Sequence, residues 1–211
     1  MLLGAWTSAD GLAADSLIID AGAGCGLIGL MMAQRCHARI IGVEIDEGGC
    51  RDCTVNFAAS PWADRLTCVY NDFLTFIPSK SVDLIVSNPP FFTTGERAPA
   101  KSRATARHED NMPLSALIKH AAEILGPQGR LAMIAPVDRS EDIIFHGALS
   151  GLPVYRLCHV ATTEGKPPRR ILVELGKTAT PYTECQLTLR HSDGTPTEEY
   201  SKLVNQFYIK I

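Results

Sequence analysis

Short apolar segments of this 211-residue chain alternate with segments of helical periodicity, and this alternation restricts the fold more than any other feature. The apolar segments lack the polar alternation of half-exposed strands, so they are typical of a parallel sheet that helices cover on both faces. The expected strands cover Ser16–Asp20, Ala38–Glu44, Leu66–Tyr70, Val82–Ser87 and Arg130–Ala135. The expected helices cover Cys25–Arg35, Asp46–Ser60, Leu114–Leu125 and Arg139–Leu149. The sequence therefore predicts a doubly wound α/β fold.

The last part of the expected sheet has a different pattern. Pro153–Thr162 and Arg169–Gly176 flank a turn rich in Gly and Pro. Such a turn between two β-branched segments predicts an antiparallel hairpin, which we expect at the edge of the sheet.

Length and hydrophobic composition indicate one domain, covering residues 1–211. The formal net charge of −3 provides no general basic field, so a nucleic-acid partner would need a local basic patch. Seven cysteines, an odd number, favour a reducing cytoplasm over a disulfide scaffold. Cys50 and Cys53 have the spacing of a metal-binding pair but lack a second such pair. No segment is typical of a signal peptide or a membrane span. We expect a cytoplasmic monomer that binds neither metal nor membrane.

A glycine-rich segment, DAGAGCGLIG, follows the first expected strand. Gly22, Gly24 and Gly26 let the backbone approach a ligand closely, and Glu44, at the end of the second strand, can accept hydrogen bonds from ribose hydroxyls. This pattern fits both NAD and S-adenosylmethionine (SAM), with a ligand-free turn as the structural alternative. Asp20 favours SAM, because a carboxylate attracts its ammonium and sulfonium groups and repels a pyrophosphate.

Asp72 and Phe73 follow the third expected strand. The Asp72 carboxylate can accept from an adenine amino group while the Phe73 ring covers one face of the base. The alternative interpretation of Asp72 is a helix or turn cap.

The segment SNPPFF ends the fourth expected strand. Pro89 and Pro90 offer no N–H and hold the backbone extended, so the segment is a rigid platform of hydrogen-bond acceptors. If the Asn88 side-chain oxygen and the Pro89 carbonyl accept the hydrogens of a planar amino group, its nitrogen can direct a lone pair at the SAM methyl. Phe91 can stack on the planar group, Phe92 lines the pocket or packs in the core, and Asn88 is also a candidate cofactor contact.

These motifs resemble the class I SAM-dependent methyltransferases that modify planar amino nitrogens. The segments LLGAW, GVEID, NPPFF, ATARHED, RRILVEL and TEEY more narrowly resemble the bacterial valine-tRNA adenine N6-methyltransferase family, over nearly the whole chain. The resemblance implies a Rossmann-like fold with a mixed seven-stranded sheet, and a tRNA substrate methylated at the adenine 3′ of the anticodon. By position it implies cofactor contacts for Asp20, Gly22, Gly24 and Glu44, contacts to the cofactor adenine for Asp72 and Phe73, and target-base contacts for Asn88, Pro89, Pro90 and Phe91.

The chain departs from this family at its start. It begins with Met1-Leu2-Leu3, whereas in the family a Gly-Thr-Asp stretch that helps to close over the cofactor precedes the LLGAW segment. We therefore expect a shortened N-terminus and weaker SAM binding.

Two groups of basic residues are candidates for phosphate contacts. The first lies in a long segment with a single acidic residue, Glu96, between residues 95 and 108, and consists of Arg97, Lys101, Arg103 and Arg107. The second, beside the expected hairpin turn, consists of Lys166, Arg169 and Arg170. The alternative for the first group is a solvated loop, but the likeness of ATARHED to the family favours RNA contact.

The sequence thus predicts a SAM-dependent enzyme that methylates adenine N6 in tRNA. The same chemistry on rRNA, DNA or a protein glutamine is the nearest alternative. An NAD-dependent oxidoreductase would leave SNPPFF unexplained, and a non-catalytic RNA-binding module predicts a basic surface without cofactor affinity.

Overall fold

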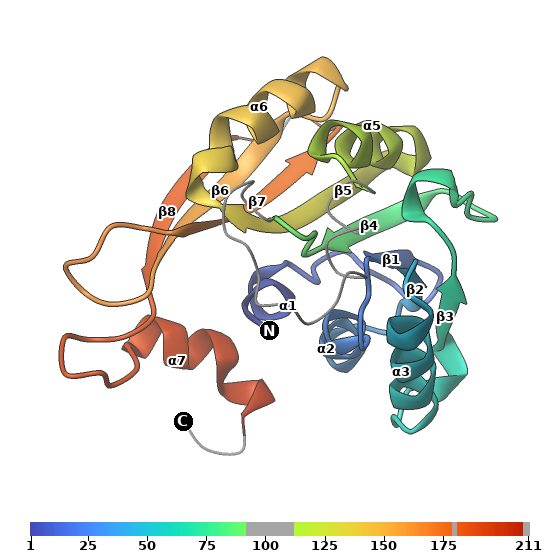
Figure 1. Cartoon of the computed structure of the whole chain (residues 1–211), viewed down its shortest axis with the longest axis horizontal. Helices are drawn as coiled ribbons and strands as arrows, with labels where there is room; N and C mark the ends of the chain where they lie inside the picture. Colours follow the sequence, from blue (N-terminus) through green and yellow to red (C-terminus); the bar gives the residue numbers. More distant parts are fainter. Residues whose placement is uncertain (92–111, 179–180, 209–211) are drawn as a thin grey trace, which may run out of the picture.

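A mixed eight-stranded sheet forms the centre of the computed structural model, which describes residues 1–91, 112–178 and 181–208 (Figure 1). The strands lie in the order β3-β2-β1-β4-β5-β7-β6-β8. Their bounds are β1 Leu17–Ala21, β2 Arg39–Glu44, β3 Leu66–Tyr70, β4 Val82–Ser87, β5 Leu125–Pro136, β6 Val154–Ala161, β7 Arg170–Gly176 and β8 Thr183–Thr188.

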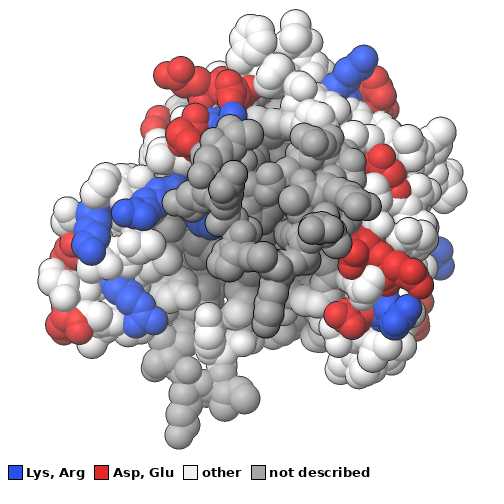
Figure 2. All heavy atoms as spheres, viewed as in Figure 1, with Lys and Arg blue, Asp and Glu red and all other residues white. Residues whose placement is uncertain are grey.

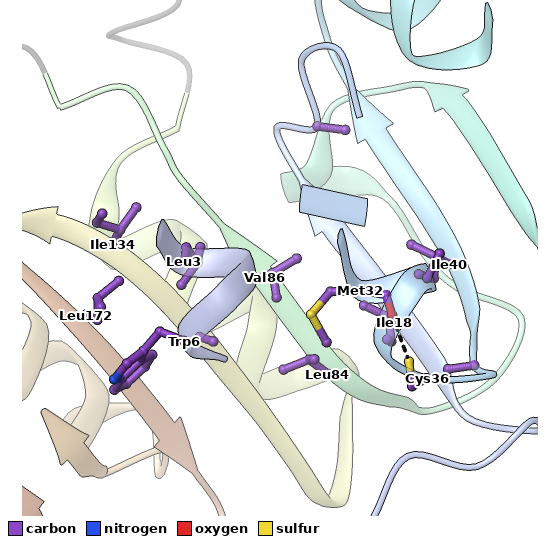
Figure 3. Packing of buried hydrophobic residues seen from close by; sticks show 14 of the residues in the cluster. Leu3, Trp6, Ile18, Met32, Cys36, Ile40, Leu84, Val86, Ile134 and Leu172 are labelled. Atoms are coloured by element: carbon purple, nitrogen blue, oxygen red, sulfur yellow. Dashed lines mark hydrogen bonds between the residues drawn. The ribbon is translucent and has the colours of Figure 1, made fainter. Parts of the chain in front are cut away.

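Helices cover both faces of the sheet. Their bounds are α1 Leu2–Trp6, α2 Leu27–Arg35, α3 Glu47–Ala58, α5 Leu114–Ile124, α6 Ser140–Leu149 and α7 Glu198–Val204. One apolar core joins α1, α2 and α3 to the first face, where Leu3, Met32 and Leu172 pack together with their neighbours (Figure 3). A second core joins α5 and α6 to the opposite face (Figure 1). None of the described helices has the length and apolar character needed to cross a bilayer.

The predicted doubly wound fold and its antiparallel hairpin are confirmed, but the sheet has eight strands rather than seven and the hairpin is not at its edge. The hairpin strands β6 and β7 are antiparallel, and β7 pairs with β5 on its other side. An eighth strand, β8, pairs parallel to β6 and is the edge strand. Four of the six β8 residues are exposed, so this strand lacks the apolar run by which the others could be recognised.

The strand order reverses between β1 and β4. From β1 the chain continues outward through β2 and β3, then returns to β4 on the other side of β1. The carboxyl ends of β1 and β4 therefore lie side by side, with Ala21 opposite Ser87, while the segments that follow them lead in opposite directions. In open α/β sheets a reversal of this kind creates a crevice at the carboxyl ends of the strands.

The N-terminal segment is tied to the far half of the sheet by a buried carboxylate. Glu174 on β7 is 1% exposed, forms a 3.2 Å ion pair with Arg156 on β6, and accepts a hydrogen bond of the same length from the Ser8 backbone N–H. The Arg156 guanidinium also lies 3.8 Å from the centre of the Trp6 ring. Loss of the carboxylate would remove the acceptor of the Ser8 N–H and the charged partner of Arg156, which would keep only its hydrogen bond to the Trp6 carbonyl and its contact with the Trp6 ring.

We therefore predict that Glu174→Ala lowers the free energy of unfolding by about 3 kcal/mol, because breaking one side of a buried ion pair leaves its partner uncompensated. Urea denaturation measures the change. Glu184→Ala is the matched control, since Glu184 on β8 also pairs with a β6 side chain, that of His159, but is half exposed. Equal stability of both variants would contradict the anchoring role of Glu174.

Candidate active site

The loop between β1 and α2 holds its glycines in conformations that other residues rarely adopt. Gly22, Gly24 and Gly26 have φ angles of 72°, 54° and 79°. At Gly26 a Cβ would also lie 2.7 Å from the Phe57 ring and 2.8 Å from the Cys53 sulfur. At Gly24 a Cβ would meet no atom within 4 Å, so the backbone there is open to a ligand.

Asp20 lies beneath this loop, at the end of β1, and is fully buried. Its Oδ2 accepts a hydrogen bond of 2.9 Å from the Gly29 backbone N–H, which ties the strand to the first turn of α2. Its Oδ1 is buried and has no hydrogen-bond partner among the described residues. Burial raises the pKa of the Asp20 carboxyl to about 7, against the opposing effect of the Gly29 hydrogen bond. A buried carboxylate oxygen without a partner fits a cationic group of a ligand.

Glu44, the last residue of β2, holds the loop from the other side. Its Oε2 accepts from the Gly24 N–H at 2.7 Å, and its Oε1 accepts from the Asp46 N–H at 2.8 Å. A carboxylate has about four acceptor positions, so Glu44 can accept further hydrogen bonds from ligand hydroxyls. The glycine loop and the acidic residue, twenty positions apart, are thus in direct contact.

A cavity of about 110 Å³ opens beside Glu44, between the ends of β1, β2 and β4. Its lining residues are Gly22, Val43, Glu44, Ile45, Asn71, Asp72, Phe73, Asn88, Pro90 and Met112. Most of the predicted cofactor residues therefore meet at one site, although Asp20, Gly24 and Gly26 lie in the adjoining loop rather than in the wall of this cavity.

Asp72 and Phe73 have structural roles in addition to their place at the cavity. Asp72 caps a short 3₁₀ turn by accepting from the Leu74 N–H at 2.9 Å, as its alternative interpretation predicted. Phe73 is buried in the core and its ring lies edge-on to His120, with centroids 5.2 Å apart. Both still reach the cavity wall.

The segment after β4 separates this cavity from a second one. Ser87 Oγ donates a 2.9 Å hydrogen bond to the Ala21 carbonyl, which fixes the end of β4 to the end of β1. Asn88 is exposed and lines the first cavity, and its side chain makes no hydrogen bond to another described residue. Pro89, Pro90 and Phe91 line the second cavity, which measures about 290 Å³. Phe92 lies outside the described residues.

The second cavity also contains residues that the sequence did not single out. They are Met112, Pro113, Leu114 and Ser115 at the start of α5, Arg139 and Asp142 at the start of α6, and His146 in the last turn of α6. No local sequence motif marks these positions. They follow residues 92–111, which lie outside the described part of the chain. Pro90 and Met112 line both cavities, so the two are adjacent.

Of the predicted phosphate contacts, Arg97, Lys101, Arg103 and Arg107 lie outside the described residues. Lys166, Arg169 and Arg170 are exposed at the turn between β6 and β7. Lys and Arg side chains gather on the left of the face in Figure 2, where this turn and β8 lie. In the described part of the chain, no cluster of His, Cys, Asp and Glu has the arrangement of a metal site.

Comparisons with known proteins agree with this geometry. A family model described as methyltransferase small domain matches residues 8–143. The tRNA1(Val) (adenine(37)-N6)-methyltransferase of Porphyromonas gingivalis is 41% identical over 222 residues, covering 99% of this chain and 86% of the relative. The protein of the same name from Vibrio parahaemolyticus is 37% identical and covers 100% of this chain and 87% of the relative.

Solved structures show the same fold at lower sequence identity. A predicted O-methyltransferase from Agrobacterium tumefaciens is 19% identical, with a TM-score of 0.74 over 97% of this chain and 94% of that one. Magnesium protoporphyrin IX methyltransferase from Synechocystis with bound SAM has 19% identity and a TM-score of 0.59, covering 83% of this chain and 76% of its own.

We predict that the raised pKa of Asp20 makes the ligand-free protein less stable as the pH rises. The folded protein keeps this proton up to a pH of about 7 and the unfolded chain releases it near 3.8, so stability falls between these values. Asp20→Asn should remove a few kcal/mol of this dependence, since one pKa unit corresponds to about 1.4 kcal/mol.

Urea denaturation at pH 5 and pH 8 measures the effect. Asp83→Asn is the matched control, because Asp83 on the neighbouring strand β4 also accepts a backbone N–H, that of Leu17. If the parent protein and Asp20→Asn lose the same stability between the two pH values, the assignment of this proton to Asp20 is wrong.

Proposed function

The chain belongs to the tRNA1(Val) (adenine(37)-N6)-methyltransferase family, within the methyltransferase small domain class, and we propose that it methylates N6 of the adenine 3′ of the anticodon in valine tRNA. It is a SAM-dependent methyltransferase. The observation that supports the proposal most is the Asn-Pro-Pro-Phe segment between two adjacent cavities, one beside the glycine loop and one able to receive a base.

In this proposal the smaller cavity and the adjoining loop hold SAM. The unpartnered Oδ1 of Asp20 fits its positive charge, and Glu44 accepts from the ribose hydroxyls. Gly22, Gly24 and Gly26 bring the backbone close to the cofactor. Asp72 and Phe73 bind its adenine from the cavity wall.

Asn88 and Pro89 prepare the substrate nitrogen. The Asn88 side-chain oxygen and the Pro89 carbonyl accept the two hydrogens of N6, which weakens the overlap of its lone pair with the ring and directs the lone pair toward the cofactor. When bound, SAM would supply a methyl group carried on sulfur to this nitrogen, with S-adenosylhomocysteine as the leaving group. The nitrogen becomes acidic as the carbon–nitrogen bond forms, so its proton can be released to solvent without a strong base.

The target adenine must leave its stack to reach this site. Phe91 is half buried in the wall of the larger cavity and offers a replacement stacking surface. Lys166, Arg169 and Arg170, which are exposed at the turn between β6 and β7, are proposed to contact the tRNA backbone together with Arg97, Lys101, Arg103 and Arg107. In the same segment, Asn88 and Pro90 line the smaller cavity, in which SAM is proposed to bind.

We predict that Asn88→Ala lowers the single-turnover rate of tRNA methylation by roughly a hundredfold or more, since an acceptor that acts mainly in the transition state is lost. The affinity for tRNA should change little. Phe91→Ala should instead weaken tRNA capture by about 1–3 kcal/mol, because it removes a stacking surface.

Transfer of a labelled methyl group to valine tRNA measures both effects. Asn205→Ala is the control, since Asn205 is exposed and lines neither cavity. Near-normal methylation by Asn88→Ala would refute the acceptor mechanism. If the parent protein methylates a glutamine peptide but not tRNA, the mechanism stands and the assignment of tRNA as the substrate is wrong.

A further inference from the structure

The larger cavity is where the target nucleoside must extend away from the cofactor. Methyl transfer requires N6 to lie within about 3–3.5 Å of the methyl carbon, so the amino edge of the base must lie at the boundary of the two cavities. Pro90 and Met112 form that boundary, because they line both. The glycosidic bond is on the opposite side of the purine from N6, so the sugar falls into the part of the larger cavity that is farthest from the cofactor.

The start of α6 lies in this direction, because α6 follows β5, and β5 pairs with β4 on the side away from β1. Arg139 and Asp142 lie there with His146, and the Arg139 Nη1 is 3.2 Å from Asp142 Oδ2. The ion pair holds the carboxylate at the cavity while its remaining acceptor positions stay available to a hydroxyl.

The local charge selects which part of the nucleotide can bind there. Asp142 is the one carboxylate among the described residues that line the cavity, and its charge is balanced by its partner Arg139. An Arg side chain that is already paired attracts a phosphate less, whereas a carboxylate with free acceptor positions accepts hydrogen bonds from hydroxyl groups. The sugar hydroxyls, rather than the phosphates, are therefore the groups that this end of the cavity suits.

We propose that Asp142 accepts a hydrogen bond from the 2′-hydroxyl of the target adenosine and thereby makes the enzyme select RNA over DNA. The proposal rests on the function proposed above and deepens it. The 2′-hydroxyl is the group that distinguishes the two nucleic acids at a single nucleotide, and Asp142 is the carboxylate that the described part of the larger cavity contributes. Arg139 is a positioning residue that holds this carboxylate in place.

The test compares two valine tRNAs that differ at one atom. One carries adenosine at the target position and the other carries 2′-deoxyadenosine. For the parent protein, kcat/KM should be about tenfold higher with the ribose substrate, as expected for one charge-assisted hydrogen bond. For Asp142→Ala the two substrates should react almost equally, and Asp142→Asn, which retains a neutral acceptor, should give an intermediate ratio.

Glu141→Ala is the matched control, because Glu141 is an exposed acid in the same first turn of α6 and does not line the cavity. It should keep the tenfold ratio. A ratio near one for the parent, or the parent's ratio in Asp142→Ala, would overturn the inference. Failure of the parent to methylate the all-ribose tRNA would instead overturn the proposed function, and this inference with it.

Discussion

The hydrogen bond from Ser87 Oγ to the Ala21 carbonyl joins the two strands between which the sheet changes direction. It is buried, and it holds the ends of β1 and β4 together just where the segments that follow them separate. The glycine loop leaves on one side and Asn-Pro-Pro-Phe on the other. Every later feature of the site depends on this geometry, because the cofactor cavity is the space between those two segments.

Negative charge is concentrated on the cofactor side of that space. Glu44 accepts the Gly24 N–H of the glycine loop, and Asp20 accepts the Gly29 N–H in the first turn of α2 that follows the loop. In the ligand-free protein this arrangement is unfavourable for Asp20, whose buried Oδ1 has no partner among the described residues. A cation bound there would favour the ionised carboxylate and lower its raised pKa. Binding of a positively charged ligand is therefore coupled to loss of the Asp20 proton.

The cofactor half of the site could be predicted from sequence because it depends mainly on the backbone. Gly22 and Gly24 adopt positive φ angles, and such requirements restrict the residue type at each position. The buried strands were predictable for a similar reason, since helices on both faces demand continuous apolar runs. The helices α1 and α7 escaped prediction because they are short and are stabilised by tertiary packing rather than by a local pattern. Strand β8 escaped prediction because most of its residues are exposed, so it has no apolar run.

The substrate half could be predicted only where the backbone again imposes a constraint, at Pro89 and Pro90. The far wall of the larger cavity comes from side chains at the start of α5 and α6, more than twenty residues beyond the proline segment. Nothing in the local sequence of Arg139 or Asp142 indicates that these residues line a cavity beside the proline segment, and the pairing of β5 with β4 brings them there. The reversal of strand order thus separates the two proposed tasks: cofactor binding belongs to the loop after β1, and substrate recognition to the segments after β4 and β5.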